Sequence, residues 1–173
     1  MRLTQWTDYT LRVLMYCAVC QGREQPITIT EIAEKHAISR SHLTKIVQQL
    51  GAMRLLETTR GRGGGIRLAK NARDINVGDV VRQTETDFNM VECFDPQANQ
   101  CGLSQHCKLK GLLHQATASY LAVLDAMTLE DLVPPALQQI ELPTTRKSND
   151  AREAAAVPVV CASGPGSPLT LNR

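Results

Sequence analysis

Three cysteines within one short segment are the residues of this sequence best suited to chemistry. Cys93, Cys101 and Cys107 are separated by seven and then five residues, in a stretch rich in turn-forming residues. Thiolates bind zinc and iron-sulfur clusters, and thiols can also pair in disulfides. Three thiols are an incomplete set for a metal site that uses four ligands, so such a site would need a further ligand other than these cysteines.

The cysteine spacing favours an iron-sulfur cluster while leaving zinc open. Structural zinc sites use closely spaced Cys-x2-4-Cys pairs and four ligands. Disulfides are disfavoured in a cytosolic protein and would leave one thiol over. A loop of this length can wrap a cluster, and the fourth position of a cluster can accept a ligand other than cysteine. The candidates for that position are Asp8, Glu92, Asp95, His106 and His114.

The residues before the cysteines predict a helix-turn-helix. Apolar residues recur at helical spacing from Thr4 to Gln21, a short second helix starts at Thr30, and Ser39 can cap a third helix that extends to Leu50. The third helix has one apolar stripe, and polar side chains at the exposed start of such a helix can bond to base edges and phosphates. The candidate DNA contacts on it are Arg40, Ser41, His42, Thr44, Lys45 and Gln48.

A basic, glycine-rich loop follows between two expected strands. Leu55–Thr59 and Ile66–Ala69 predict a hairpin, and residues 60–65 between them read RGRGGG. Glycines allow a tight hairpin and the close approach of a partner. A nucleotide-binding loop is disfavoured because the sequence lacks Gly-Lys-Ser/Thr and a strand-to-helix context. A helix-turn-helix followed by this hairpin indicates a winged helix, and its candidate DNA contacts are Arg60, Arg62 and Arg67.

The charge distribution points to a polyanionic partner. The whole chain has a net charge of +2, yet residues 40–73 contain eight Lys/Arg and one Asp/Glu, a local net of +7. Such a cluster is typical of a surface that binds double-stranded DNA. With 43% hydrophobic and only 3% aromatic residues, the composition suits a helical core of aliphatic side chains.

The second half of the chain predicts a dimerisation helix. Asn76 can cap a short helix to Thr84, and residues 108–127 follow helical spacing with a wide apolar face. Paired DNA half-sites require paired recognition helices, so we expect this helix to join two protomers. A further short helix is expected to start at Thr128–Asp131. The predicted fold is therefore mainly α with a small β-hairpin wing, and its expected parts are a winged-helix domain (1–84), a cluster-binding loop (85–107), the dimerisation and C-terminal helices (108–142) and a disordered tail (143–173).

The remaining cysteines and the compartment can also be predicted. Cys17 and Cys20 form a C-x-x-C inside a helix without a preceding strand, which favours core packing over chemistry. Cys161 lies in the tail, and we assign it no function. The apolar run ending at Cys20 is interrupted by Arg12 and lacks a cleavage site, so we expect a cytoplasmic protein without a membrane partner.

Five segments of the sequence resemble the NsrR family of nitric-oxide-sensing repressors, which are relatives of the cluster-assembly regulator IscR. They are residues 2–14 (RLTQWTDYTLRVL), 38–43 (ISRSHL), 60–68 (RGRGGGIRL), 75–82 (INVGDVVR) and 91–93 (VEC). The resemblance covers roughly residues 1–140 and includes the three-cysteine loop. It implies a homodimeric winged-helix repressor that releases its operator when nitric oxide attacks a [4Fe-4S] or, alternatively, a [2Fe-2S] cluster held by Cys93, Cys101 and Cys107. It further implies that Asp8 of the partner protomer is the fourth ligand.

Two other functions remain open at this point. One is an IscR-like regulator that responds to cluster or iron supply, although the seven-then-five spacing and Asp8 favour the nitric oxide branch. The other is a small iron-sulfur electron carrier, which would not need the basic segment with its Gly-Arg hairpin. The sequence shows no pairing of a base with a nucleophile and no cofactor loop, so we do not expect an enzyme.

Overall fold

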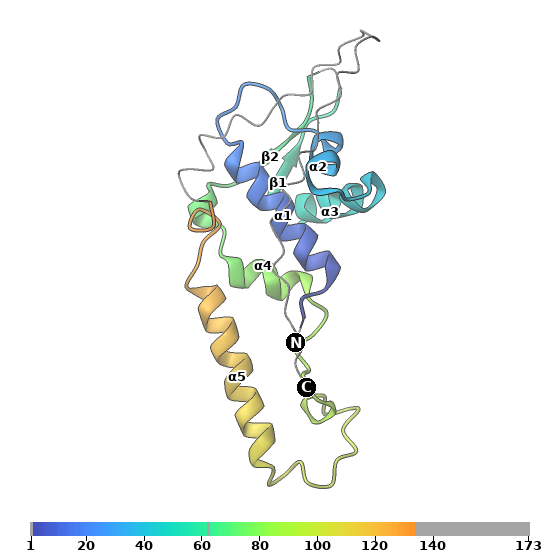
Figure 1. The fold of residues 1–173 in the computed structure, drawn as a ribbon, viewed down its shortest axis with the longest axis vertical. Helices are drawn as coiled ribbons and strands as arrows, with labels where there is room; N and C mark the ends of the chain where they lie inside the picture. The colour runs from blue at the N-terminus through green and yellow to red at the C-terminus, as the bar shows by residue number, and fades with distance from the viewer. Residues whose placement is uncertain (1, 62, 134–173) are drawn as a thin grey trace, which may run out of the picture. The chain divides into compact units, whose positions relative to one another are not determined.

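The computed structural model describes residues 2–61 and 63–133, which form a mainly α-helical protein with one small hairpin (Figure 1). This is the fold class that the sequence predicts. The elements in chain order are the helices α1 (Gln5–Val19), α2 (Ile29–His36) and α3 (Arg40–Ala52), the strands β1 (Leu56–Thr58) and β2 (Ile66–Leu68), and the helices α4 (Val77–Thr84) and α5 (Lys108–Asp125). Single 3-10 turns cover Ala72–Asp74 and Glu92–Phe94.

Side-chain caps define where four of the helices begin. The side-chain oxygens of Thr4, Ser39 and Asn76 each accept a hydrogen bond from the backbone N–H three residues later, which confirms Ser39 and Asn76 as the predicted caps. Thr28 caps α2 in the same way, so this helix starts at Ile29, one residue earlier than the sequence suggests. Each cap satisfies an N–H group that has no partner within the helix.

The third helix ends differently from the prediction. Gly51 lies inside α3, and the left-handed residue that closes the helix is Arg54, with φ of 57°. The Leu55 N–H donates to the Leu50 carbonyl over 2.9 Å and turns the chain into β1. Glycine usually occupies this left-handed position, so the sequence, which predicts a helix to Leu50, gives no sign that α3 continues to Ala52.

Helix α1 lies at the centre of the core and contacts α2, α3, α4 and β2 (Figure 1). Its Leu14 is fully buried, as are Ile32 of α2 and Leu43 of α3. The predicted apolar stripe of α3 is buried throughout, so the helix is held with its polar face outward. This packing positions the candidate recognition surface.

The hairpin is fastened to the segment before α2. The register of the hairpin pairs Leu56 with Leu68 and Thr58 with Ile66, and the Ile66 N–H donates to the Ile27 carbonyl over 2.8 Å. A Cβ atom at Gly65 would lie 2.5 Å from the Cβ of Pro26, so this glycine is needed for the close approach. Ile27 is joined to the hairpin by an isolated antiparallel bridge to Ile66.

The chain returns to the core after α5. Thr128 pairs with Asn76 in an isolated antiparallel bridge, and Leu129 is only 1% exposed among the core residues. The predicted helix at Thr128–Asp131 is wrong, because the Asp131 carboxylate accepts hydrogen bonds from the N–H and hydroxyl of Thr128 and forms a turn. The predicted tail, residues 143–173 with Cys161, lies outside the described residues.

Two polar contacts tie the ends of the 85–127 segment to neighbouring elements. Glu85 Oε1 accepts hydrogen bonds from the N–H of Thr4, at 2.8 Å, and from its hydroxyl, at 3.1 Å. Arg82 of α4 forms a bidentate ion pair with Asp125 at the end of α5, with one N···O distance of 2.7 Å. Gly78 leaves the space for Asp125 to approach α4. Among the helices that the structure describes, none is long and apolar enough to cross a membrane.

Candidate functional site

The polar face of α3 is open to solvent. All six predicted DNA contacts on this helix, from Arg40 to Gln48, are exposed. The Thr44 hydroxyl donates to the Arg40 carbonyl over 2.8 Å, so its proton is used within the helix. The His42 ring lies edge-on to the ring of Tyr9 in α1, with the centroids 6.1 Å apart. The face can therefore offer guanidinium, ammonium, hydroxyl and amide groups to a partner.

The arginines of the wing differ in their freedom. Arg67 pairs with Glu57 across the hairpin, with an Nη2 to Oε2 distance of 2.7 Å and a side chain that is 76% exposed. Arg60 is exposed, and no ion pair involves it among the described residues. Arg62 lies outside the described residues. Arg60 is thus the described wing residue whose charge is fully available to a phosphate.

The structure places the three cysteines in one loop and at the start of one helix. Cys93 is half-buried in the 3-10 turn Glu92–Phe94, Cys101 is exposed, and Cys107 precedes the first residue of α5. All three thiols are free of disulfide bonds. Within the described part of the chain, no three His, Cys, Asp or Glu side chains come together as a metal site. The thiols therefore share a loop but are not gathered around one point.

Polar side chains fold the loop between the cysteines. Glu92 Oε1 accepts a hydrogen bond from the Gln100 N–H at 2.7 Å, and Asn99 Oδ1 accepts one from the Cys101 N–H at 3.0 Å. Asp95 Oδ1 accepts another from Gln97 over 2.8 Å. Two candidate fourth ligands, Glu92 and Asp95, thus use a carboxylate oxygen within the loop itself.

An aromatic stack fastens the loop to α5. The rings of Phe94 and His114 are nearly parallel, at 7°, with their centroids 3.8 Å apart. Phe94 directly follows Cys93, so this contact fixes the first cysteine beside the helix that follows the third. The sequence does not indicate this contact, because helical periodicity places His114 on α5 without indicating its partner. His106, another candidate ligand, is exposed.

Asp8 is paired within its own helix. Its Oδ1 accepts a hydrogen bond from Arg12 Nε at 3.0 Å, and its Oδ2 lies 2.8 Å from Arg12 Nη2. The two side chains are 44% and 45% exposed. This pair raises the pKa of Arg12 through the hydrogen bond and charge of Asp8. Asp8 does not join the cysteines of its own chain in a metal site within residues 2–61 and 63–133.

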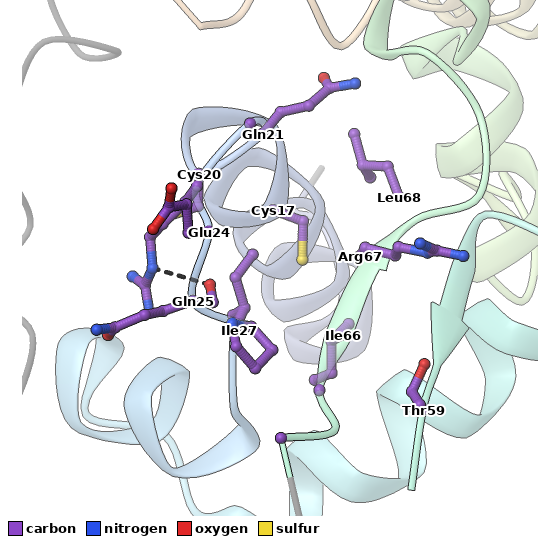
Figure 2. Close-up of a pocket in the computed structure, with 15 residues that line it drawn as sticks. Cys17, Cys20, Gln21, Glu24, Gln25, Ile27, Thr59, Ile66, Arg67 and Leu68 are labelled. Atoms are coloured by element: carbon purple, nitrogen blue, oxygen red, sulfur yellow. Dashed lines mark hydrogen bonds between the residues drawn. The ribbon is translucent and has the colours of Figure 1, made fainter.

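Cys17 and Cys20, the C-x-x-C pair at the end of α1, line a pocket together with residues of the hairpin. Figure 2 shows Cys17 among the residues that line this pocket, which has a volume of about 430 Å³ and is also lined by Ile27 and Leu68. Cys17 is only 2% exposed, and burial raises the pKa of its thiol to about 12. Burial also raises the pKa of Cys20. Both thiols are protonated near neutral pH, which agrees with the predicted role in core packing rather than chemistry.

Comparison with known proteins gives the same fold and a regulatory class. The family described as Rrf2, iron-dependent transcriptional regulator, matches residues 3–135. HTH-type transcriptional regulator NsrR of Bacillus subtilis (strain 168) is 53% identical over 133 residues, which cover 77% of this chain and 90% of that protein.

Solved structures resemble this chain over about three quarters of its length. T. potens IscR has a TM-score of 0.61 and 26% identity, and covers 76% of this chain and 85% of its own. CymR, the global cysteine regulator of B. subtilis, has a TM-score of 0.59 and 26% identity, and the match covers 76% of this chain and 95% of the CymR chain. The relatives are transcriptional regulators, which confirms the resemblance noted in the sequence and the expectation of a DNA-binding regulator rather than an enzyme. With its winged helix and a family match over residues 3–135, the chain belongs to the Rrf2 family of iron-dependent transcriptional regulators.

Proposed function

We propose that this protein is a homodimeric repressor that senses nitric oxide through an iron-sulfur cluster, of the [4Fe-4S] or [2Fe-2S] type, bound by Cys93, Cys101 and Cys107. The observation that supports this best is the position of three free thiols in one loop, between the winged-helix elements and the long helix α5. A regulator with its ligands at this point has a sensor directly connected to its DNA-binding part. We further propose a cytoplasmic location, where double-stranded DNA is accessible.

The donor set suits a cluster. Soft thiolates are the usual ligands of iron-sulfur clusters, and the three thiols are half-buried or exposed rather than locked in the core. None of them is within a disulfide, so all are available. A cluster bound here would supply iron that reacts with nitric oxide. Because the thiols are not gathered in the isolated chain, the loop must close around the cluster as it binds.

Asp8 of the partner protomer is the proposed fourth ligand. A carboxylate oxygen is a harder ligand than thiolate and should bind such iron more weakly, leaving this position open to a diatomic ligand. In the single chain the Asp8 carboxylate is already held by Arg12 over 2.8 Å. Arg12 and the metal site therefore compete for the same two oxygens, which further weakens the fourth position.

The dimer is proposed to form along α5. Of its residues only Thr117 is buried, and the exposed fractions are 59% for Leu109, 61% for Leu112 and 67% for Val123. Several large apolar side chains exposed along one helix commonly mark an interface. Pairing of two α5 helices would bury them and present two α3 helices to paired half-sites.

Helix α5 also connects the loop to the DNA-binding elements. Its first residue follows Cys107, and its last residue, Asp125, forms the ion pair with Arg82 of α4. Helix α4 in turn contacts α1, which contacts α3. A rearrangement of the loop can therefore be transmitted to the recognition helix through packed helices.

A DNA-shift titration with nitric oxide on anaerobically purified protein tests the proposal. We expect a brown protein that binds its operator and releases it as nitric oxide is added, with loss of the visible absorbance. Release on iron removal but not with nitric oxide would instead indicate a sensor of iron or cluster supply. A colourless, zinc-loaded protein with full DNA binding would rule out the cluster. A brown protein without DNA binding would be an electron carrier.

A further inference from the structure

We propose that Glu92 is a positioning residue of the cysteine loop, whose carboxylate closes the segment between Cys93 and Cys101 before a metal centre binds. This inference rests on the proposed function for the identity of the centre, but it concerns a contact within the protein itself. Glu92 directly precedes Cys93, and Gln100, the residue whose N–H it accepts at 2.7 Å, directly precedes Cys101. One hydrogen bond thus brings together the two backbone positions next to two proposed ligands.

The hydrogen bond between Glu92 and Gln100 closes residues 92–100 into a loop, and further hydrogen bonds form inside this loop. Within it the Asn99 N–H donates to the Asp95 carbonyl over 3.0 Å, and the Asp95 carboxylate accepts from Gln97. Asn99 then accepts from the Cys101 N–H and donates to Ser104 Oγ, each over 3.0 Å. The closed segment therefore has a defined path, although seven residues separate its two cysteines and a longer loop is more costly to order.

Each cysteine has its own attachment in this arrangement. The Phe94–His114 stack fixes the turn of Cys93 on α5, and Cys107 precedes the first residue of the same helix. Cys101 is the exposed and central thiol, and its attachment runs through Glu92 and Asn99. Loss of the Glu92 bond would leave the middle ligand held only by its neighbours in the loop, while the outer two keep their attachment to α5.

The structure favours a positioning role over direct ligation by Glu92. Its Oε1 is used by a backbone N–H, and a charged acceptor makes such a bond stronger than a neutral one. Residues that hold ligands in place typically change metal affinity by about ten- to a hundredfold when they are replaced. Glutamine keeps an oxygen that can accept from Gln100, whereas it is a poor ligand for iron. The Gln variant therefore separates the two roles.

The test compares Glu92→Ala, Glu92→Gln and a control, Gln105→Ala, with the wild type. Gln105 lies in the same loop, is exposed, and has no side-chain hydrogen bond among the described residues. In the apo protein, amide exchange of Gln100 is followed by NMR. In the anaerobic holoprotein, the rate at which a chelator removes the visible absorbance is measured together with the absorbance and circular dichroism spectra.

We expect faster Gln100 exchange in the apo Ala variant and loss of its cluster about tenfold faster than in the wild type. The Gln variant should stay within about threefold of the wild type with an unchanged spectrum, and Gln105→Ala should match the wild type. Equal exchange and equal cluster loss in wild type and Glu92→Ala would overturn the inference. A Gln variant with an altered spectrum would do so too, because Glu92 would then be a ligand. If the wild type holds no cluster, the proposed function fails, while the exchange of Gln100 still decides whether Glu92 closes the segment.

Discussion

Arg12 binds both carboxylate oxygens of Asp8 one turn away on α1, at 3.0 Å and 2.8 Å. The proposed fourth ligand is thus satisfied within its own chain when no metal is bound. The pair is about half exposed, and an exposed pair with this spacing on a helix contributes only about 0.3–0.5 kcal/mol to stability. Such a weak pair can be exchanged for a metal site without unfolding the helix.

Asp8→Ala should therefore weaken the metal site with little effect on the fold. We expect the cluster to be lost at least about tenfold faster to a chelator, while the apo protein unfolds within about 0.5 kcal/mol of the wild type. Arg12→Ala removes the competitor and should slow the loss of the cluster. The decay of the visible absorbance measures cluster loss, and urea unfolding measures the stability of the apo protein. Identical decay in Asp8→Ala and wild type would mean that this carboxylate is not a ligand.

Each of Cys93, Cys101 and Cys107 should be required for the cluster. Replacement of any one by Ala leaves two thiols, and we expect colourless protein and derepression of a reporter gene. Cys17→Ala is the matched control, since this thiol is only 2% exposed in the core. It should keep the cluster and lose about 1 kcal/mol of stability. Iron and sulfide analysis of anaerobically purified variants is the measurement, and a brown Cys101→Ala protein would contradict the assignment.

The wing arginines should differ in their contribution to DNA binding. Arg60 has no ion pair among the described residues, whereas Arg67 is paired with Glu57 over 2.7 Å. Arg60→Ala should weaken operator binding and reduce the slope of log K against log salt by about 1. Arg67→Ala should change the slope less. Fluorescence anisotropy between 50 and 200 mM salt, about the range over which such slopes are seen, compares the two. An unchanged slope for Arg60→Ala would place this residue away from phosphates.

A charge on the exposed stripe of α5 should separate the protomers. Leu112 is 61% exposed, and Leu112→Glu would bury a carboxylate in the proposed interface, where an unpaired charge is costly. We expect a monomer in analytical ultracentrifugation, with helix content retained. Ala122→Glu places the same charge on another exposed position of α5 and should leave the dimer intact. A dimeric Leu112→Glu protein would show that the interface lies elsewhere.

The buried thiol of Cys17 should make stability depend on alkaline pH. Burial raises its pKa from 9.0 to about 12, so above about pH 9 the unfolded chain releases a proton that the folded chain keeps. The contribution of this thiol to the free energy of unfolding is therefore fully present below about pH 9 and is lost as the pH rises toward about 12. Urea unfolding from pH 8 to 11 should show a decline that is shallower in Cys17→Ala. Native protein should also resist alkylation of this thiol at pH 8.

Local patterns in the sequence were enough to predict several features of the fold. The caps Ser39 and Asn76 and the buried apolar stripe of α3 depend only on neighbours in the chain. The cysteine loop and the hairpin could be located in the same way. These features follow from spacing and from the turn preferences of single residues.

Contacts between distant residues were not predictable. Nothing near Leu129 indicates that it returns to the core beside Ile75, and Arg54 shows no sign of its left-handed conformation. The Phe94–His114 stack joins residues that are twenty positions apart. Such contacts arise from the packing of whole elements, which a single sequence does not reveal.

The two attachments of the 85–127 segment have a consequence for how the protein unfolds. The segment departs at Glu85, which is bound to Thr4, and returns at Thr128, which is bridged to Asn76. Both junctions lie on the winged-helix elements, so the segment is an insertion that leaves the winged-helix part of the chain and returns to it. It can open as a separate cooperative unit at a lower free energy than the rest of the domain. Damage to the proposed cluster site would then leave the winged-helix part folded, and the segment could refold on it without complete refolding of the chain.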